Sequence, residues 1–115
     1  MCAMSRATAP DERDLRIVGE RRSLALHHAV GEKLRHDPPL LDRARNRITR
    51  WLAEGDIHPR YGQEWLRLLN GPLEELIRVL DDPSDHARAL RSCSPFAGVL
   101  DPKTRWRIWR EVGRE

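Results

Sequence analysis

Proline recurs at short intervals along this chain and constrains its fold more than any other feature. Proline has no backbone N–H to donate, so it is best tolerated in the first turn of a helix, where that donor would be unpaired. In three of five such positions an aspartate precedes the proline and can cap the exposed amides. The five predicted helix starts are Asp37-Pro38, His58-Pro59, Gly71-Pro72, Asp82-Pro83 and Asp101-Pro102.

The segments between these prolines carry apolar residues at helical spacing, and none alternates as a strand would. A chain of 115 residues has the size of one domain with a single core. The sequence therefore predicts an all-α fold, a compact bundle of about six short helices. The apolar stripes are Leu41, Ala44, Ile48, Trp51 and Leu52; Tyr61, Trp65, Leu68 and Leu69; and Leu73, Leu76, Ile77 and Leu80.

An earlier helix is predicted from about Ser23, a plausible N-cap, to His36, where Asp37-Pro38-Pro39 ends it. Residues 1–20 are mixed in charge and poor in large apolar groups, so we expect them to form a flexible N-terminal arm. Residues 21–115 are then expected to form a single helical domain.

Composition excludes several classes of protein. Charged residues make up 34% of the chain and its longest uncharged apolar runs are short, which predicts no membrane span. The first residues lack the apolar stretch of a secretory signal, and the two cysteines, Cys2 and Cys93, show no CxxC spacing. We therefore expect a cytoplasmic protein with free thiols, in which Cys93 is a packing residue.

One set of side chains is spaced as helical metal ligands are. His28, Glu32 and His36 follow one another at four-residue steps and would share a helix face. The chain has no HExxH sequence, and His36 stands at a helix end before two prolines. We therefore favour an ordinary solvated face and predict no metal or other cofactor.

Nucleophilic chemistry has equally little support in the sequence. Ser92, Cys93 and Ser94 would need a nearby base, for which His86 is the closest histidine along the chain, while His27 is expected to be a partly buried packing residue. Serines before a proline are typical of a helix end, and the glycines form no phosphate-binding motif. These observations predict that the protein is not an enzyme.

Charge is unevenly distributed along a chain whose net charge is +3. The segment 72–86 has one arginine against five acidic residues, whereas Arg43, Arg47 and Arg50 are expected on one helix face opposite the apolar stripe. That basic ridge is either a surface for nucleic-acid phosphates or the solvated back of an amphipathic helix.

The segment 94–111 contains the only phenylalanine and two of the four tryptophans. Its predicted helix carries Trp106 and Trp109 one turn apart, with Arg107 and Arg110 beside them, and Trp and Arg are the residue types that most often dominate interface energetics. Phe96 and Leu100 are expected to position this helix. The alternatives are that both tryptophans close the core or that they stack on nucleic-acid bases.

The stretches SLALHHAVGEKLR, GPLEELIRVL and SPFAGVLDPKTRWRIWRE together resemble a small bacterial family of all-helical, antitoxin-like and regulatory proteins, over Ser23 to Glu111. In some similar proteins the helical unit follows a helix-turn-helix domain, but only some 20 arm residues precede it here. The resemblance thus implies the interaction half of such a protein.

Together these observations predict a protein–protein interaction module, antitoxin-like or regulatory, whose partner is a protein such as a toxin. Trp106, Arg107, Trp109 and Arg110 would make the contact. The alternative is a basic nucleic-acid-binding regulator that uses Arg43, Arg47 and Arg50, and self-association into a homo-oligomer stays open.

Overall fold

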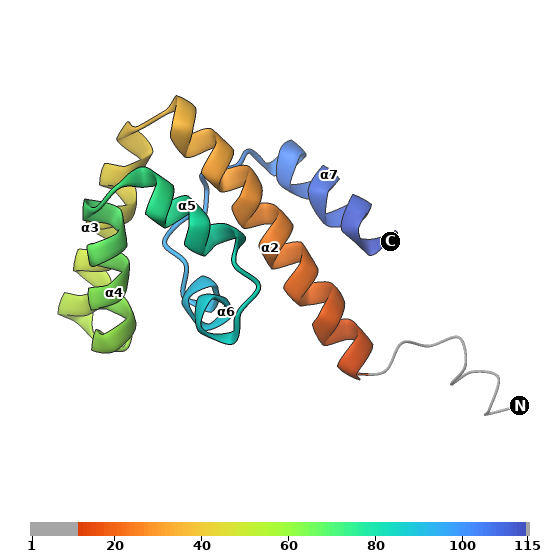
Figure 1. Cartoon of the computed structure of the whole chain (residues 1–115), viewed down its shortest axis with the longest axis horizontal. Helices are drawn as coiled ribbons and strands as arrows, with labels where there is room; N and C mark the ends of the chain where they lie inside the picture. Colours follow the sequence, from red (N-terminus) through yellow and green to blue (C-terminus); the bar gives the residue numbers. More distant parts are fainter. Residues whose placement is uncertain (1–11, 115) are drawn as a thin grey trace, which may run out of the picture.

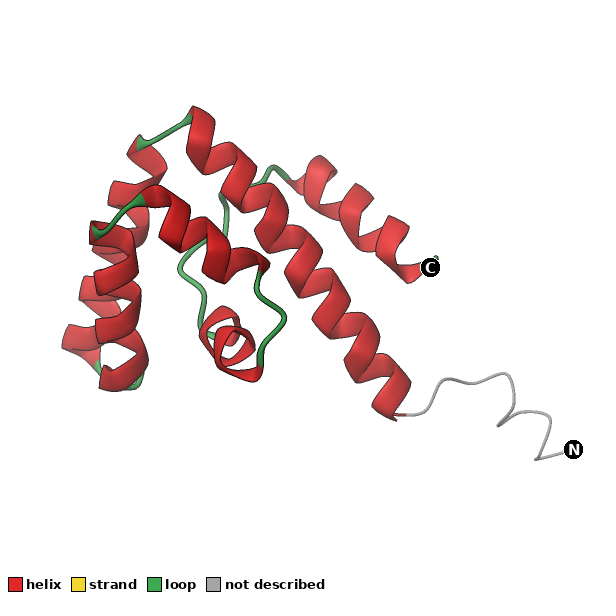
Figure 2. Ribbon diagram, viewed as in Figure 1, coloured by secondary structure: helices red, strands yellow, loops and turns green. Residues whose placement is uncertain are grey.

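The computed structural model describes residues 12–114, which form six helices and no strand. The predicted all-α bundle is confirmed (Figure 2). The helices are α2 (Glu12–His36), α3 (Pro39–Glu54), α4 (Pro59–Asn70), α5 (Leu73–Asp81), α6 (Asp85–Ser92) and α7 (Pro102–Gly113).

The prolines mark the helix starts to within three residues. Pro59 and Pro102 are the first residues of α4 and α7, and Asp101 caps α7 by accepting a hydrogen bond of 2.8 Å from the Thr104 amide. The cap of α6 differs from the expectation, because Ser84 and not Asp82 accepts from the Ala87 amide. Asp82 instead accepts from the amide of Ser84 and so shapes the turn before the helix.

The first long helix begins earlier than predicted. It starts at Glu12, so Ser23 lies inside α2 and is not its N-cap, and residues 12–20, assigned to the arm, are helical. The boundary expected between residues 20 and 21 therefore falls within a helix. No proline interrupts the chain between residues 12 and 36, and a single serine or glycine is tolerated in a helix interior. Residues 1–11, the rest of the predicted arm, lie outside the described part.

Helix α2 is the central element of the fold. It packs against α5 and α6 on one side and against α7 on the other (Figure 1). Helices α3 and α4 pack against each other, and α4 also packs against α5. Helix α7 runs back along α2 toward the N-terminal part of that helix. It therefore forms a separate layer outside the main core.

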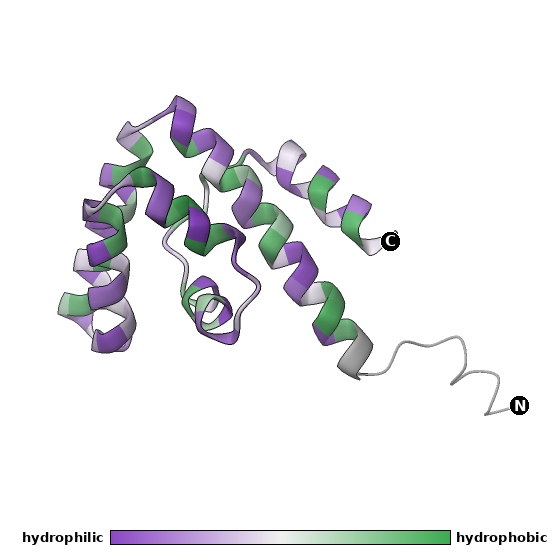
Figure 3. Cartoon of the chain, viewed as in Figure 1, coloured by the Kyte–Doolittle hydropathy of each residue, from purple (hydrophilic) through white to green (hydrophobic). Residues whose placement is uncertain are grey.

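The core lies between α2, α3, α4, α5 and α6 and includes the loop before α7. Trp65 is fully buried and its ring meets that of Phe96 edge-on, with centroids 5.7 Å apart. Figure 3 shows hydrophobic residues alternating with hydrophilic ones along these helices and along the N-terminal half of α2. The cluster comprises Val30, Leu34, Leu40, Ala44, Ile48, Ile57, Trp65, Leu68, Leu69, Leu76, Leu80, Leu90, Phe96 and Val99.

Substituting tryptophans at two depths tests this core. We expect Trp65→Ala to lower the free energy of unfolding by about 3–5 kcal/mol, because it leaves a large cavity at a fully buried position. The matched change Trp106→Ala, at a residue 54% exposed, should cost about 1 kcal/mol or less. Urea unfolding followed by far-UV circular dichroism measures both values, and equal losses would contradict the assignment of Trp65 to the core.

Candidate functional site

The C-terminal helix presents an exposed aromatic surface. Trp106 is 54% exposed and Trp109 is 40% exposed, although both are large apolar side chains. Their rings stack on each other, with centroids 4.9 Å apart and planes inclined by 9°. The alternative that both tryptophans close the core is therefore wrong. We call Trp106, Arg107, Trp109 and Arg110 the tryptophan face.

Helix α7 can expose these rings because it uses other residues to pack. Val112 is buried, Ile108 is half-buried, and α7 contacts mainly α2. The helix start is fixed by the Asp101 cap, and the hydrogen bonds to Thr104 hold the pKa of Asp101 below its usual value. Phe96, which is expected to position this helix, lies in the loop before it and packs in the core.

An arginine from α2 holds the tryptophan face in place. Arg22 donates from Nε to the carbonyl oxygen of Trp109 at 2.9 Å, and its guanidinium carbon lies 3.5 Å from the centroid of the Trp109 ring. Arg110 stands 5.9 Å from the centroid of Trp106. Sequence reasoning missed Arg22, because 87 residues separate it from Trp109 and no local pattern connects them.

The basic ridge of α3 is divided by the structure. Arg43 and Arg50 are exposed, but Arg47 reaches the loop before α7 and donates to the carbonyl oxygens of Pro95 at 3.2 Å and Ala97 at 2.9 Å. Arg47 thus does not lie opposite the apolar stripe as expected. Its guanidinium supports a loop, which leaves two of the three arginines fully available at the surface.

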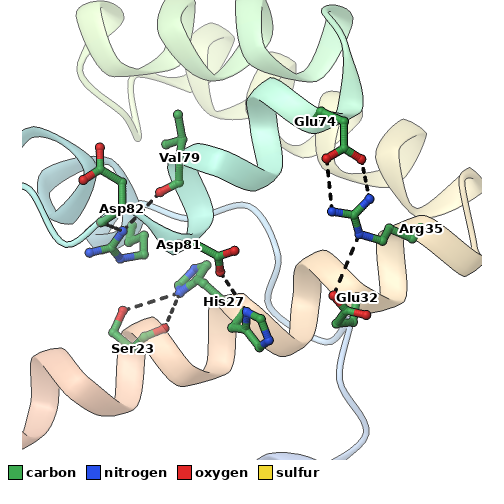
Figure 4. Close-up of polar contacts among 10 residues, drawn as sticks. Ser23, His27, Glu32, Arg35, Glu74, Val79, Asp81 and Asp82 are labelled. Carbon is green, nitrogen blue, oxygen red and sulfur yellow. Dashed lines mark hydrogen bonds and ion pairs between the residues drawn. The ribbon is translucent and has the colours of Figure 1, made fainter.

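Two of the three residues that are spaced as metal ligands on α2, His28 and Glu32, pair with different partners, and His36 is exposed at the helix end. His28 Nδ1 lies 3.0 Å from Asp81 of α5. Glu32 lies 3.8 Å from Arg35, as Figure 4 shows. Arg35 also pairs with Glu74, and that hydrogen bond lowers the pKa of the Glu74 carboxyl. Within residues 12–114 no three side chains are grouped as metal ligands.

A histidine and a serine that are distant in sequence meet beside the loop before α7. His27 Nδ1 lies 2.7 Å from the carbonyl oxygen of Ser23, and Nε2 lies 2.8 Å from Ser94 Oγ (Figure 4 shows the Ser23 contacts). A carbonyl only accepts, so Nδ1 carries the proton and Nε2 accepts from the serine hydroxyl. His27 is half-buried, as expected, but the sequence offered no sign of its partner.

The histidine that is nearest to Ser94 in sequence is not its base. His86 Nε2 lies 2.6 Å from Glu64 of α4, while Ser92 donates to a carbonyl within α6. Cys93 is a free, half-buried thiol whose pKa is raised by burial. The packing role expected for it is in keeping with its position against the core cluster.

The chain matches no protein-family model, no curated protein sequence and no solved structure. None of the helices in residues 12–114 is both long enough and apolar enough to cross a membrane.

The contact between Arg22 and Trp109 predicts a local loss of stability. Arg22→Met should lower the free energy of unfolding by about 1 kcal/mol, because it removes a hydrogen bond and a cation–π contact. It should also change the tryptophan fluorescence of the native protein. Arg21→Met, an equal change at the exposed neighbour of Arg22, is the control. Equal effects of both variants on stability and fluorescence would contradict the assigned role.

The burial of His27 predicts a pH dependence. Burial is the largest influence lowering the pKa of His27 below 6.5, the charge of Arg91 lowers it further, and the Ser23 hydrogen bond opposes both. As the pH falls below 6.5, His27 is therefore protonated in the unfolded chain before it is protonated in the folded protein. The free energy of unfolding decreases over this range, until the pH has passed the pKa of His27 in the folded protein. The carboxyls of Glu74 and Asp101, whose pKa values are lowered, lose their contributions only at more acidic pH.

This loss should appear in urea unfolding measured between about pH 7 and pH 5. His27→Gln should flatten the dependence in that window, whereas His28→Gln should leave the contribution of His27 in place. An unchanged slope in the His27 variant would show that another group is responsible.

Proposed function

We propose that this chain is a non-enzymatic interaction module that binds a protein partner through the tryptophan face of α7. The observation that carries the proposal is the exposure of a stacked Trp106–Trp109 pair on a helix that packs by other residues. A large exposed apolar group keeps water in contact with aromatic surface, and burying it in a complex releases a substantial free energy.

The composition of the face is that of an interface hot spot. Trp and Arg are enriched among residues whose truncation costs the most binding energy, and such residues lie together at an interface centre. Here the two rings form one continuous surface, Arg110 lies beside the Trp106 ring, and Arg107, the next residue in sequence after Trp106, is exposed. The partner that fits this face has an apolar recess for the indoles and acidic residues around it.

The face is also held in its conformation before binding. Trp109 is fixed by the stacking of Trp106 and by Arg22, so fewer rotamers are lost when a partner covers the pair. This preorganisation favours a specific partner contact over non-specific adhesion. In this proposal the module is a cytoplasmic regulatory or antitoxin-like component and its partner is a toxin-like protein, for which the support is the motif resemblance alone.

Nucleic acid is the alternative partner class. Arg43 and Arg50 are exposed on α3 and could contact phosphates, and tryptophans with neighbouring arginines could stack on bases. The occupation of Arg47 by the loop weakens this ridge. The tryptophan face therefore supports a protein partner better than the ridge supports nucleic acid.

Charge reversal at two surfaces separates these classes. The double variant Arg107→Glu, Arg110→Glu should reduce partner binding at least about tenfold. The matched double variant Arg43→Glu, Arg50→Glu changes the net charge by the same amount on α3 and should retain partner binding. Each tagged variant is used to capture its partners from host extract, with and without nuclease, and the captured molecules are identified. Circular dichroism checks that each variant is folded.

The outcomes are distinct. A stoichiometric, nuclease-resistant protein that is lost with the α7 variant supports the proposal. Nuclease-sensitive material that is lost with the α3 variant and falls steeply with salt overturns it in favour of nucleic acid. Capture of only a second copy of the chain, lost with the α7 variant, would overturn it in favour of a homo-oligomer.

A further inference from the structure

A cavity of about 250 Å³ lies between α2, the end of α6 and the loop that leads to α7. Leu26, Val30, Phe96 and Leu100 form its apolar wall. Arg91 and Arg105 also line it, from α6 and α7 respectively. We call it the Arg91 cavity. Ligand sites typically combine such an apolar wall with a few polar groups, and this volume lies below the range for drug-sized ligands.

Arg91 is a buried cation that lacks a carboxylate partner. Only 6% of its surface is exposed, and it makes no ion pair with the described residues. Its Nη1 donates to the carbonyl oxygens of Val79 at 3.2 Å and Asp82 at 2.5 Å, while Nε has no hydrogen-bond partner within residues 12–114. Burying a charge is costly, and burial is the largest influence on the pKa of Arg91, which it lowers, while the more distant charges of Asp82, Asp81 and Glu20 oppose that effect.

The other polar groups of the cavity provide no negative charge. His27 and Ser94 are satisfied by each other and Ser92 by a carbonyl of its own helix, while no aspartate or glutamate lines the cavity. Arg105 is exposed and so can follow a ligand at the cavity rim. The combination is a positive, partly buried recess with an apolar wall.

We propose that the Arg91 cavity binds a small carboxylate that carries an apolar chain or ring. Its carboxylate would lie toward Arg91 and Arg105, and its apolar part would cover Leu26, Val30 and Phe96. A charge-assisted hydrogen bond to a buried guanidinium supplies orientation, and burial of the apolar part supplies affinity. This site is separate from the partner contact of the tryptophan face and is tested on the isolated chain.

Octanoate is the probe, titrated into the purified chain and followed by two-dimensional amide NMR. We expect saturable binding in about the millimolar range, with shifts confined to residues 26–30 of α2, residues 91–100 and the region of Arg105. Two compounds divide the recognition. Octan-1-ol has the same chain without the charge, and acetate has the charge without the chain, so both should bind at least about tenfold more weakly.

Two variants of α7 provide the matched control. Arg105→Glu reverses a charge at the cavity and should weaken octanoate binding at least about tenfold, whereas Arg107→Glu makes the same change on the same helix away from it. If the Arg91→Met variant folds, it should no longer bind octanoate. If it does not fold, the Arg105→Glu variant provides the test, because Arg105 is exposed.

Three results would overturn the proposal. They are the absence of saturable octanoate shifts, octan-1-ol binding that is as tight as that of octanoate, and equal weakening by the two α7 variants. The first result would show that the cavity binds no such ligand, and the second that the carboxylate is not recognised. The third would show that the protein's overall charge, and not Arg105, affects binding.

Discussion

The edge-on contact between Trp65 and Phe96 ties the surface of this molecule to its core. Trp65 is fully buried where α4 meets α3 and α5, and Phe96 brings the loop before α7 against it. Arg47 adds hydrogen bonds to two carbonyls of the same loop. Since α7 begins directly after this loop at the Asp101 cap, the core determines where the helix starts and so where the tryptophan face lies.

Helix α2 divides the molecule into two layers with different energetics. One side of it packs against α5 and α6, and Leu34 is fully buried, whereas the other side packs against α7. A helix that packs against a single neighbour retains much of its own surface in water. That arrangement explains how a small domain can expose two tryptophans without losing its core, and why a contact such as Arg22 with Trp109 is needed to hold them.

Local rules predicted most of the fold but little of the site. Proline positions and apolar spacing gave five of the helices, because both act within one turn of the chain. The predicted start of α2 was wrong, because the weakly apolar segment 12–22 is also helical. Such a segment can form a helix when no proline interrupts it and another helix packs against part of it. The pairing of His27 with Ser94 joins residues 67 apart in sequence, and only the packing of the loop on α2 creates it. The exposure of the tryptophans likewise depends on which face of α7 packs against α2. The apolar residues of α7 span a wide arc, so the sequence was compatible with buried and with exposed tryptophans.

Arg105 lies between the Arg91 cavity and the tryptophan face, although it is not part of that face. Arg105 lines the cavity and also a second recess formed with Leu26, Pro102, Trp106 and Trp109. An anion that draws its guanidinium toward Arg91 would change the recess beneath the indoles, and a partner seated on the indoles would restrict where Arg105 can go. By thermodynamic linkage the two effects have the same size and sign. A ligand of the cavity would therefore alter the affinity of the face, and a bound partner would alter the affinity of the cavity equally.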